Sequence, residues 1–204
     1  ANAALYCGAQ VDFVDIDFDT NNMSIEYLKV KLESSKKNGT LPKVVMPVHM
    51  GGHSCDMKEI YKLSKEYNFK IIEDASHAIG GTYNDNPIGS CEYSDIAIFS
   101  FHPVKIITTA EGGVALTNNE KLFQKMNILR THGITRDKSF MVNTDEGPWY
   151  YEQIDLGDYT IKKGEEVALI LGATGRDNTV WSHPEYFKPD RIIKKNTAFG
   201  GGIH

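Results

Sequence analysis

The sequence predicts an α/β fold in which a mostly parallel sheet carries helices on both faces. Two observations predict it. Short apolar runs of strand length alternate with amphipathic segments of roughly a dozen residues through most of the chain. Turn-forming residues separate them, as at 38–42 (NGTLP). Because each helical segment has one apolar stripe to bury, the simplest solution is helices packed on a sheet.

The first elements follow from local pattern. Residues 11–16 alternate apolar and acidic side chains, which predicts a strand. Residues 24–33 place apolar side chains at helical spacing, and residues 44–48 form a short apolar run typical of a buried strand. Residues 56–59 (DMKE) match a capping box, which predicts a helix that runs to about Tyr67.

The next elements complete the sheet. Further core strands are predicted at 71–74, 95–100 and 113–116. Asn119 then caps a helix that Gly133 ends. Beyond Gly157 the chain is rich in glycine and proline, and residues 167–171 alone predict a strand there. The fold therefore changes character near Gly157.

Composition narrows the class of protein. The 204 residues carry a net charge of −5, with 41% hydrophobic and 24% charged residues, as in an ordinary globular chain. The mild acidity and the lack of a basic stripe argue against nucleic acid as a partner. No apolar run approaches the roughly 18 residues of a membrane helix. The start, ANAAL, lacks a methionine and a signal peptide's charged region, which leaves a processed chain or a segment of a longer one.

The cysteines indicate a reducing compartment. Cys7, Cys55 and Cys91 are odd in number and widely spaced, so they are not a disulfide framework. The cytosol is the simplest location. Cys7 and Cys91 are expected to be buried small apolar residues.

The ends of two predicted strands carry the chemistry. Asp74 and Ser100 each end a strand, His77 follows the first and Lys105 follows the second. Ligands of parallel sheets bind beyond the carboxyl ends of the strands. A lysine there can hold pyridoxal 5′-phosphate (PLP) as a Schiff base, and an acid can keep the pyridine nitrogen protonated. The alternative is a solvated loop lysine and an acid that caps a turn.

Within that hypothesis each residue has a role. Lys105 anchors the cofactor and later moves a proton between the substrate carbon and C4′ of the cofactor. Asp74 pairs with the ring nitrogen. His77 packs on the ring or meets its phenolic oxygen, and Ser100 donates to the phosphate.

The loop at 49–55 (HMGGHSC) has a spacing that resembles metal ligands. No second cluster completes a set of four ligands. A strand-to-helix loop with incidental histidines is expected there, and no metal.

Several segments occur in a characteristic order: 1–3 (ANA) with 8–9 (GA), 14–17 (VDID), 73–78 (EDASHA), 99–105 (FSFHPVK), 111–113 (EGG) and 129–133 (LRTHG). In these segments residues 1–157 resemble the DegT/DnrJ/EryC1/StrS family, the PLP-dependent aminotransferases of nucleotide-linked keto sugars. The pairs Ser76-His77 and Phe101-His102 look most like the branch that makes 4-amino-4,6-dideoxy sugars for pseudaminic acid.

The resemblance implies a large domain of the type I PLP-transferase fold. It gives Lys105 the Schiff base, Asp74 the pyridine nitrogen, His77 the ring contact and Ser100 the phosphate. It further implies glutamate as amino donor, a UDP-linked 4-keto-6-deoxy sugar as acceptor, and a homodimer with shared sites. The family pattern begins upstream of Ala1, with a helix N-terminus that binds the phosphate, and continues beyond Gly157. The chain is therefore expected to hold a truncated domain with weak or no activity.

Beyond Gly157 the chain carries the segments 159–164 (YTIKKG), 173–177 (ATGRD), 189–191 (PDR) and 198–204 (AFGGGIH). In this order residues 158–204 resemble a second family, the cytochrome P-450 monooxygenases, in the stretch before the haem cysteine. Phe199 and the glycines that follow would lie under the haem, and His204 would reach a propionate. The thiolate would lie two positions past His204, so no haem is expected. The alternatives for this segment are a plain glycine-rich end or a genuine domain of the transferase. The whole is expected to be two truncated pieces joined near Gly157; an inert chimeric chain and a haem-thiolate monooxygenase are the alternative functions.

Overall fold

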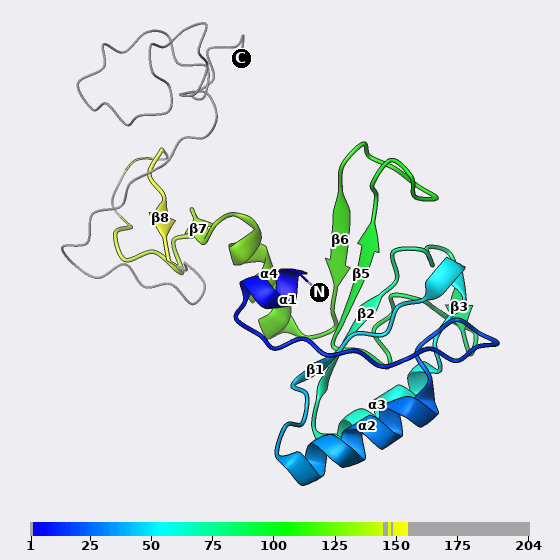
Figure 1. Cartoon of the computed structure of the whole chain (residues 1–204). Coiled ribbons are helices and arrows are strands. Elements are labelled where there is room, and N and C mark those ends of the chain that lie inside the picture. Colours follow the sequence, from blue (N-terminus) through cyan, green and yellow to red (C-terminus); the bar gives the residue numbers. More distant parts are fainter. Residues whose placement is uncertain (1, 145–146, 148, 155–204) are drawn as a thin grey trace, which may run out of the picture. The chain divides into compact units, whose positions relative to one another are not determined.

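A four-stranded sheet organises the computed structural model, which describes residues 2–144, 147 and 149–154 (Figure 1). Its strand order is β1-β2-β5-β6. The strands are β1 (Val44–Val45), β2 (Lys70–Asp74), β5 (Ile96–Ser100) and β6 (Gly113–Leu116). The first three are mutually parallel, and β6 runs antiparallel to β5. The predicted α/β fold with a mostly parallel sheet is therefore confirmed.

Two predicted helices form, and each begins after a capping side chain. Helix α2 (Ile25–Asn38) begins after Ser24, whose side chain accepts the Tyr27 N–H at 3.3 Å. It continues past the predicted end to Gly39, which adopts the left-handed conformation of a helix end (φ +69°). Helix α3 (Met57–Tyr67) begins after Asp56, whose carboxylate accepts the Glu59 N–H at 3.3 Å, as the capping box predicts.

Helices α2 and α3 lie side by side on one side of β1 and β2 (Figure 1). The main core lies between these helices and that face of the two strands. The buried side chains are Leu28, Leu32, Val45, Cys55, Met57, Ile60, Leu63, Phe69 and Ile71. Each large apolar side chain contributes about 1.5–3 kcal/mol on burial. A smaller cluster of Ala75, Ala78, Ile88 and Phe99 lies around the segment after β2. Together these contacts hold β2 and β5 at the centre of the sheet.

The remaining elements are short. They are α1 (Asn2–Tyr6), the 3₁₀ turn η1 (Met50–Gly52), β3 (Thr82–Tyr83), β4 (Asn86–Pro87), α4 (Glu120–Arg130), β7 (Ile134–Thr135) and β8 (Glu152–Gln153). Helix α4 is capped by Asn119 as predicted. None of the helices in the described part of the chain is long and apolar enough to span a membrane.

Several local predictions are wrong. Residues 11–16 are not a strand, and Ile16 makes an isolated bridge to Met23. Asp12 and Asp15 accept the backbone N–H of the residue that follows each, at 2.8 Å, so those amides are unavailable to a sheet. Cys7 is exposed rather than buried, whereas Cys91 is buried.

The strand predicted at 113–116 forms as β6, whereas only Val44–Val45 of the strand predicted at 44–48 forms and Val48 makes an isolated bridge to Asp74. These two strands are the edges of the sheet. Both are less covered than expected for core strands. Val44 in β1 and Leu116 in β6 are exposed. The direction of β6 was not predicted. The strand predicted at 167–171, and the rest of 158–204, lie outside the described residues.

Candidate functional site

The sheet brings Asp74 and Ser100 to one edge and one face. β2 and β5 are parallel neighbours, so their carboxyl ends meet at the same edge. Asp74 pairs with Ile98, and Ser100 lies two residues further along β5. Since side chains two apart in a strand share a face, Asp74 and Ser100 face the same side.

Asp74 is half-buried and keeps one oxygen free of described partners. Oδ1 accepts the Ser76 N–H at 3.1 Å. No described residue donates to Oδ2. That oxygen is therefore available to a ligand N–H.

Lys105 lies in the loop from β5 to β6. Figure 1 shows this loop beyond the end of the two strands. The Ser100 hydroxyl accepts the His102 N–H at 3.4 Å, and the Lys105 N–H donates to the His102 carbonyl at 2.9 Å. Lys105 is half-buried, although the residues on both sides of it are exposed. Within the described residues no ion pair holds its ammonium group.

His77 belongs to the segment after β2 and meets the loop after β1. Its Nδ1 accepts the Gly51 N–H in a long hydrogen bond of 3.4 Å, so the proton of the neutral ring lies on Nε2. Gly52 lies against the His77 carbonyl, where a Cβ would come within 2.9 Å of the oxygen, and its φ is +88°. A glycine is required there on both counts.

The backbone places these four residues at or beyond the same end of the sheet. No hydrogen bond or ion pair between described residues joins Lys105 to Asp74, His77 or Ser100. Each retains a group for a ligand: an amine, a carboxylate oxygen, an imidazole N–H and a hydroxyl. An aromatic nitrogen base with phenolic and phosphate oxygens needs this donor and acceptor set, so the residues fit PLP.

A buried polar network beside this site was missed from the sequence. His49 is fully buried, and its Nε2 lies 2.9 Å from Glu73 Oε1. Ser94 donates to Glu73 Oε2 at 2.8 Å. Burial acts to raise the pKa of Glu73, but the hydrogen bonds from His49 and Ser94 outweigh it and hold that pKa below its ordinary value. The available sequence signal was the alternation of Ile71 and Glu73, which puts an acid at an inward position of β2.

The loop at 49–55, whose histidines have a spacing that resembles metal ligands, contributes His49 and Cys55 to this hydrogen-bond network instead. His49 uses both ring nitrogens, because Nδ1 accepts the Cys55 N–H at 3.1 Å. The Cys55 thiol donates to the Val48 carbonyl at 3.2 Å. In the described part of the chain no three His, Cys, Asp or Glu side chains gather as metal ligands.

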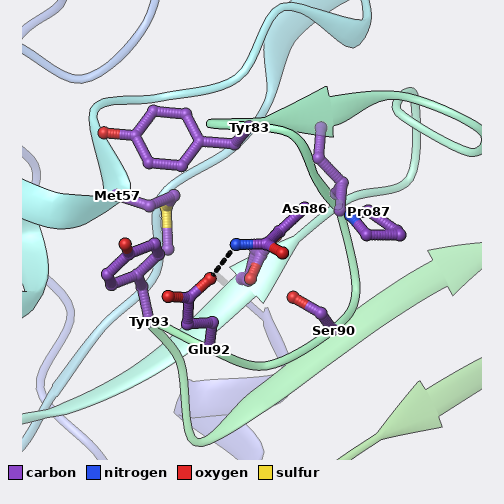
Figure 2. A pocket seen from close by; sticks show the side chains of 9 residues that line it. Met57, Tyr83, Asn86, Pro87, Ser90, Glu92 and Tyr93 are labelled. Carbon is purple, nitrogen blue, oxygen red and sulfur yellow. Dashed lines mark hydrogen bonds between the residues drawn. The ribbon is translucent and has the colours of Figure 1, made fainter.

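A small pocket lies on the other side of the sheet, the side that Glu73 faces. Figure 2 shows Tyr83 and Tyr93 on one side of it, and Asn86 hydrogen-bonded to Glu92. None of the four candidate side chains lines this pocket. It is therefore separate from the candidate site.

Known proteins of one family are similar to this chain. The model of the DegT/DnrJ/EryC1/StrS aminotransferase family matches residues 1–150. A UDP-4-amino-4,6-dideoxy-N-acetyl-beta-L-altrosamine transaminase from Campylobacter jejuni is 42% identical over 84% of this chain and 41% of its own length. A second Campylobacter jejuni protein of that name is 37% identical over 89% of the chain and 50% of its own length.

Solved structures give the same result. Helicobacter pylori PseC, an aminotransferase of pseudaminic acid biosynthesis, has a TM-score of 0.61 at 31% identity, over 69% of this chain and 36% of its own. A protein of Streptococcus pneumoniae described as a sugar aminotransferase, in its PLP form, has a TM-score of 0.57 at 28% identity, over 76% of this chain and 40% of its own. The chain spans half or less of the length of these relatives. A second family model, cytochrome P450, matches residues 150–203, most of which lie outside the described residues.

Proposed function

Because the chain belongs to the DegT/DnrJ/EryC1/StrS aminotransferase family, we propose that residues 1–157 bind PLP through Lys105 and serve the amination of a nucleotide-linked sugar. One observation carries the proposal. Asp74 and Ser100 share a face at the end of the sheet, and the segments that hold His77 and Lys105 begin at that same end. Bound PLP would supply an electron sink that stabilises a substrate carbanion.

Each side chain would hold PLP through the polar group that it keeps free. Asp74 Oδ2 would accept from the pyridine N–H, in a charge-assisted bond about twice as strong as a neutral one. His77 Nε2 would donate to the phenolic oxygen, and the Ser100 hydroxyl would donate to the phosphate. Lys105 Nζ would hold the cofactor and would serve as the base that moves a proton at the substrate carbon.

The substrate class rests on the relatives. Both Campylobacter jejuni proteins are transaminases of a UDP-linked 4-amino-4,6-dideoxy sugar by name, and PseC belongs to pseudaminic acid synthesis. We therefore extend the proposal to a UDP-linked 4-keto-6-deoxy sugar as acceptor and glutamate as donor.

A homodimer is part of the proposal. Val104, Ile106 and Ile107 surround Lys105 in the chain and are exposed in the monomer. Exposed apolar residues next to a site are typical of a protein interface.

We also propose a cytosolic location, supported by three free cysteines.

The cytochrome P450 model matches residues 150–203, and we propose no function for that segment. The junction near Gly157 remains our proposed boundary between two segments of different origin.

A PLP titration of the full chain tests the proposal. We expect saturable binding with an absorbance band near the visible edge, which glutamate then depletes. Lys105→Ala should lose the band, whereas Lys121→Ala, a matched change of an exposed lysine in α4, should keep it. A parent protein without the band would contradict the proposal and favour an inert chimeric chain.

A further inference from the structure

We infer that His49 and Glu73 form a buried positioning unit for Asp74 and His77, although neither residue faces the candidate site. This inference rests on the proposed function, since Asp74 and His77 are the side chains proposed to contact the cofactor ring. Such residues act through others: they hold the groups that touch the ligand within the narrow geometry that binding needs.

The His49 ring has one possible proton arrangement. Nδ1 accepts the Cys55 N–H at 3.1 Å, so it carries no proton. The proton of the neutral ring is therefore on Nε2 and is donated to Glu73 Oε1 at 2.9 Å. Both nitrogens are engaged in a fully buried ring. His49 is thus fixed in orientation by two bonds from different elements.

Glu73 transmits this constraint along β2. Its carboxylate accepts from His49 on one oxygen and from Ser94 on the other. Successive residues of a strand face opposite sides, so a Glu73 held inward obliges Asp74 to face the candidate site. A slip of one residue would exchange the two acids. The Glu73 bonds therefore fix the side on which Asp74 is presented.

The backbone of His49 is hydrogen-bonded to the carboxyl end of β2. The His49 N–H donates to the Asp74 carbonyl at 3.0 Å, and the Asp74 N–H donates to the Pro47 carbonyl at 2.9 Å. These bonds and the His49–Glu73 bond fasten the loop after β1 to the last two residues of β2. The position of Asp74 thus depends on both the side chain and the backbone of one loop.

The same loop reaches His77. The His49 carbonyl accepts the Gly52 N–H at 3.1 Å, which closes the η1 turn. Gly51 in that turn donates to His77 Nδ1, and Gly52 lies against the His77 carbonyl. The buried loop that contains His49 therefore contacts both Asp74 and His77, the residues proposed to contact the cofactor ring.

A double-mutant cycle tests the inference. His49→Leu removes the donor and the acceptor of the ring, whereas His49→Gln keeps an amide donor and a carbonyl acceptor. We expect His49→Leu to weaken PLP binding about tenfold, or about 1.4 kcal/mol, and His49→Gln to recover part of it. In an Asp74→Asn background, His49→Leu should weaken binding less than twofold, because the group it positions is already changed.

Ile60→Val provides the control for stability alone. Ile60 is fully buried in α3 within the main core, so this change lowers stability without touching the loop. It should leave PLP affinity within about twofold of the parent. Equal losses for His49→Leu in both Asp74 backgrounds would overturn the inference and indicate a merely structural role.

Amide hydrogen exchange gives a readout that needs no cofactor. In His49→Leu we expect faster exchange at the Asp74 and Gly52 amides than at amides within α2, and near-parental exchange in His49→Gln. A uniform rise across the chain would overturn the inference. Failure of the parent to bind PLP would overturn the proposed function instead, and the exchange pattern would still decide the role of His49.

Discussion

Replacing Glu73 by alanine should destabilise the fold far more than replacing an exposed glutamate. The change leaves the Nε2–H of fully buried His49 without an acceptor. A buried donor without a partner costs about 1–3 kcal/mol. The Ser94 hydroxyl also loses its acceptor, but Ser94 is half-buried and can turn to water. The packing of the Glu73 side chain is lost as well. The free energy of unfolding is therefore expected to fall by about 2–4 kcal/mol.

Urea unfolding of the full chain at neutral pH measures this loss. Glu33→Ala is the matched control, because Glu33 is exposed on α2, and it should change stability by less than about 0.5 kcal/mol. Glu73→Leu keeps most of the side-chain volume and should remain destabilised, since it supplies no acceptor. A Glu73→Ala protein within about 0.5 kcal/mol of the parent would refute the reasoning.

Two further predictions concern titratable groups. Burial, with the nearby charges of Glu73 and Asp56, raises the pKa of the Cys55 thiol to about 11. An alkylating reagent at pH 8 should therefore label exposed Cys7 before Cys55. Equal labelling rates of the two cysteines in a peptide map would contradict this. The pKa of Glu73 is lower in the folded protein than the roughly 4.3 of an unfolded glutamate. Its contribution to stability is therefore complete above about pH 4.3 and is lost as the pH falls through the folded pKa. The urea midpoint of Glu73→Gln should fall less steeply with acid than that of the parent, and parallel curves would contradict the assignment.

Local signals in the sequence predicted local structure well. The capping box at Asp56 and the Asn119 cap both place a helix correctly, because the partners lie within three residues of each other. The alternation at 11–16 misled, since period 2 does not reveal that Asp12 and Asp15 bind their own neighbouring amides. The antiparallel direction of β6 depends on how the 101–112 loop returns, which hydrophobic pattern does not encode.

In the candidate site, too, the features set by local sequence were predicted and the tertiary contacts were not. Strand ends and the parallel-sheet rule were enough to predict that Asp74 and Ser100 gather at one edge. The His49–Glu73 hydrogen bond was not predictable, because it joins residues 24 apart in the chain. Its only sign in the sequence is an acid at an inward position of β2. Tertiary contacts of this kind are set by packing and not by local propensity.

The most direct test of the account is to locate the covalent link to the cofactor. The full chain is mixed with PLP, reduced with borohydride to make the lysine link permanent, and digested with a protease that cleaves after glutamate. We expect the phosphopyridoxyl mass on the peptide that contains Lys105, and its loss when Asp74→Asn weakens cofactor binding. A mass spread over exposed lysines such as Lys121, with no enrichment at Lys105, would contradict the central claim.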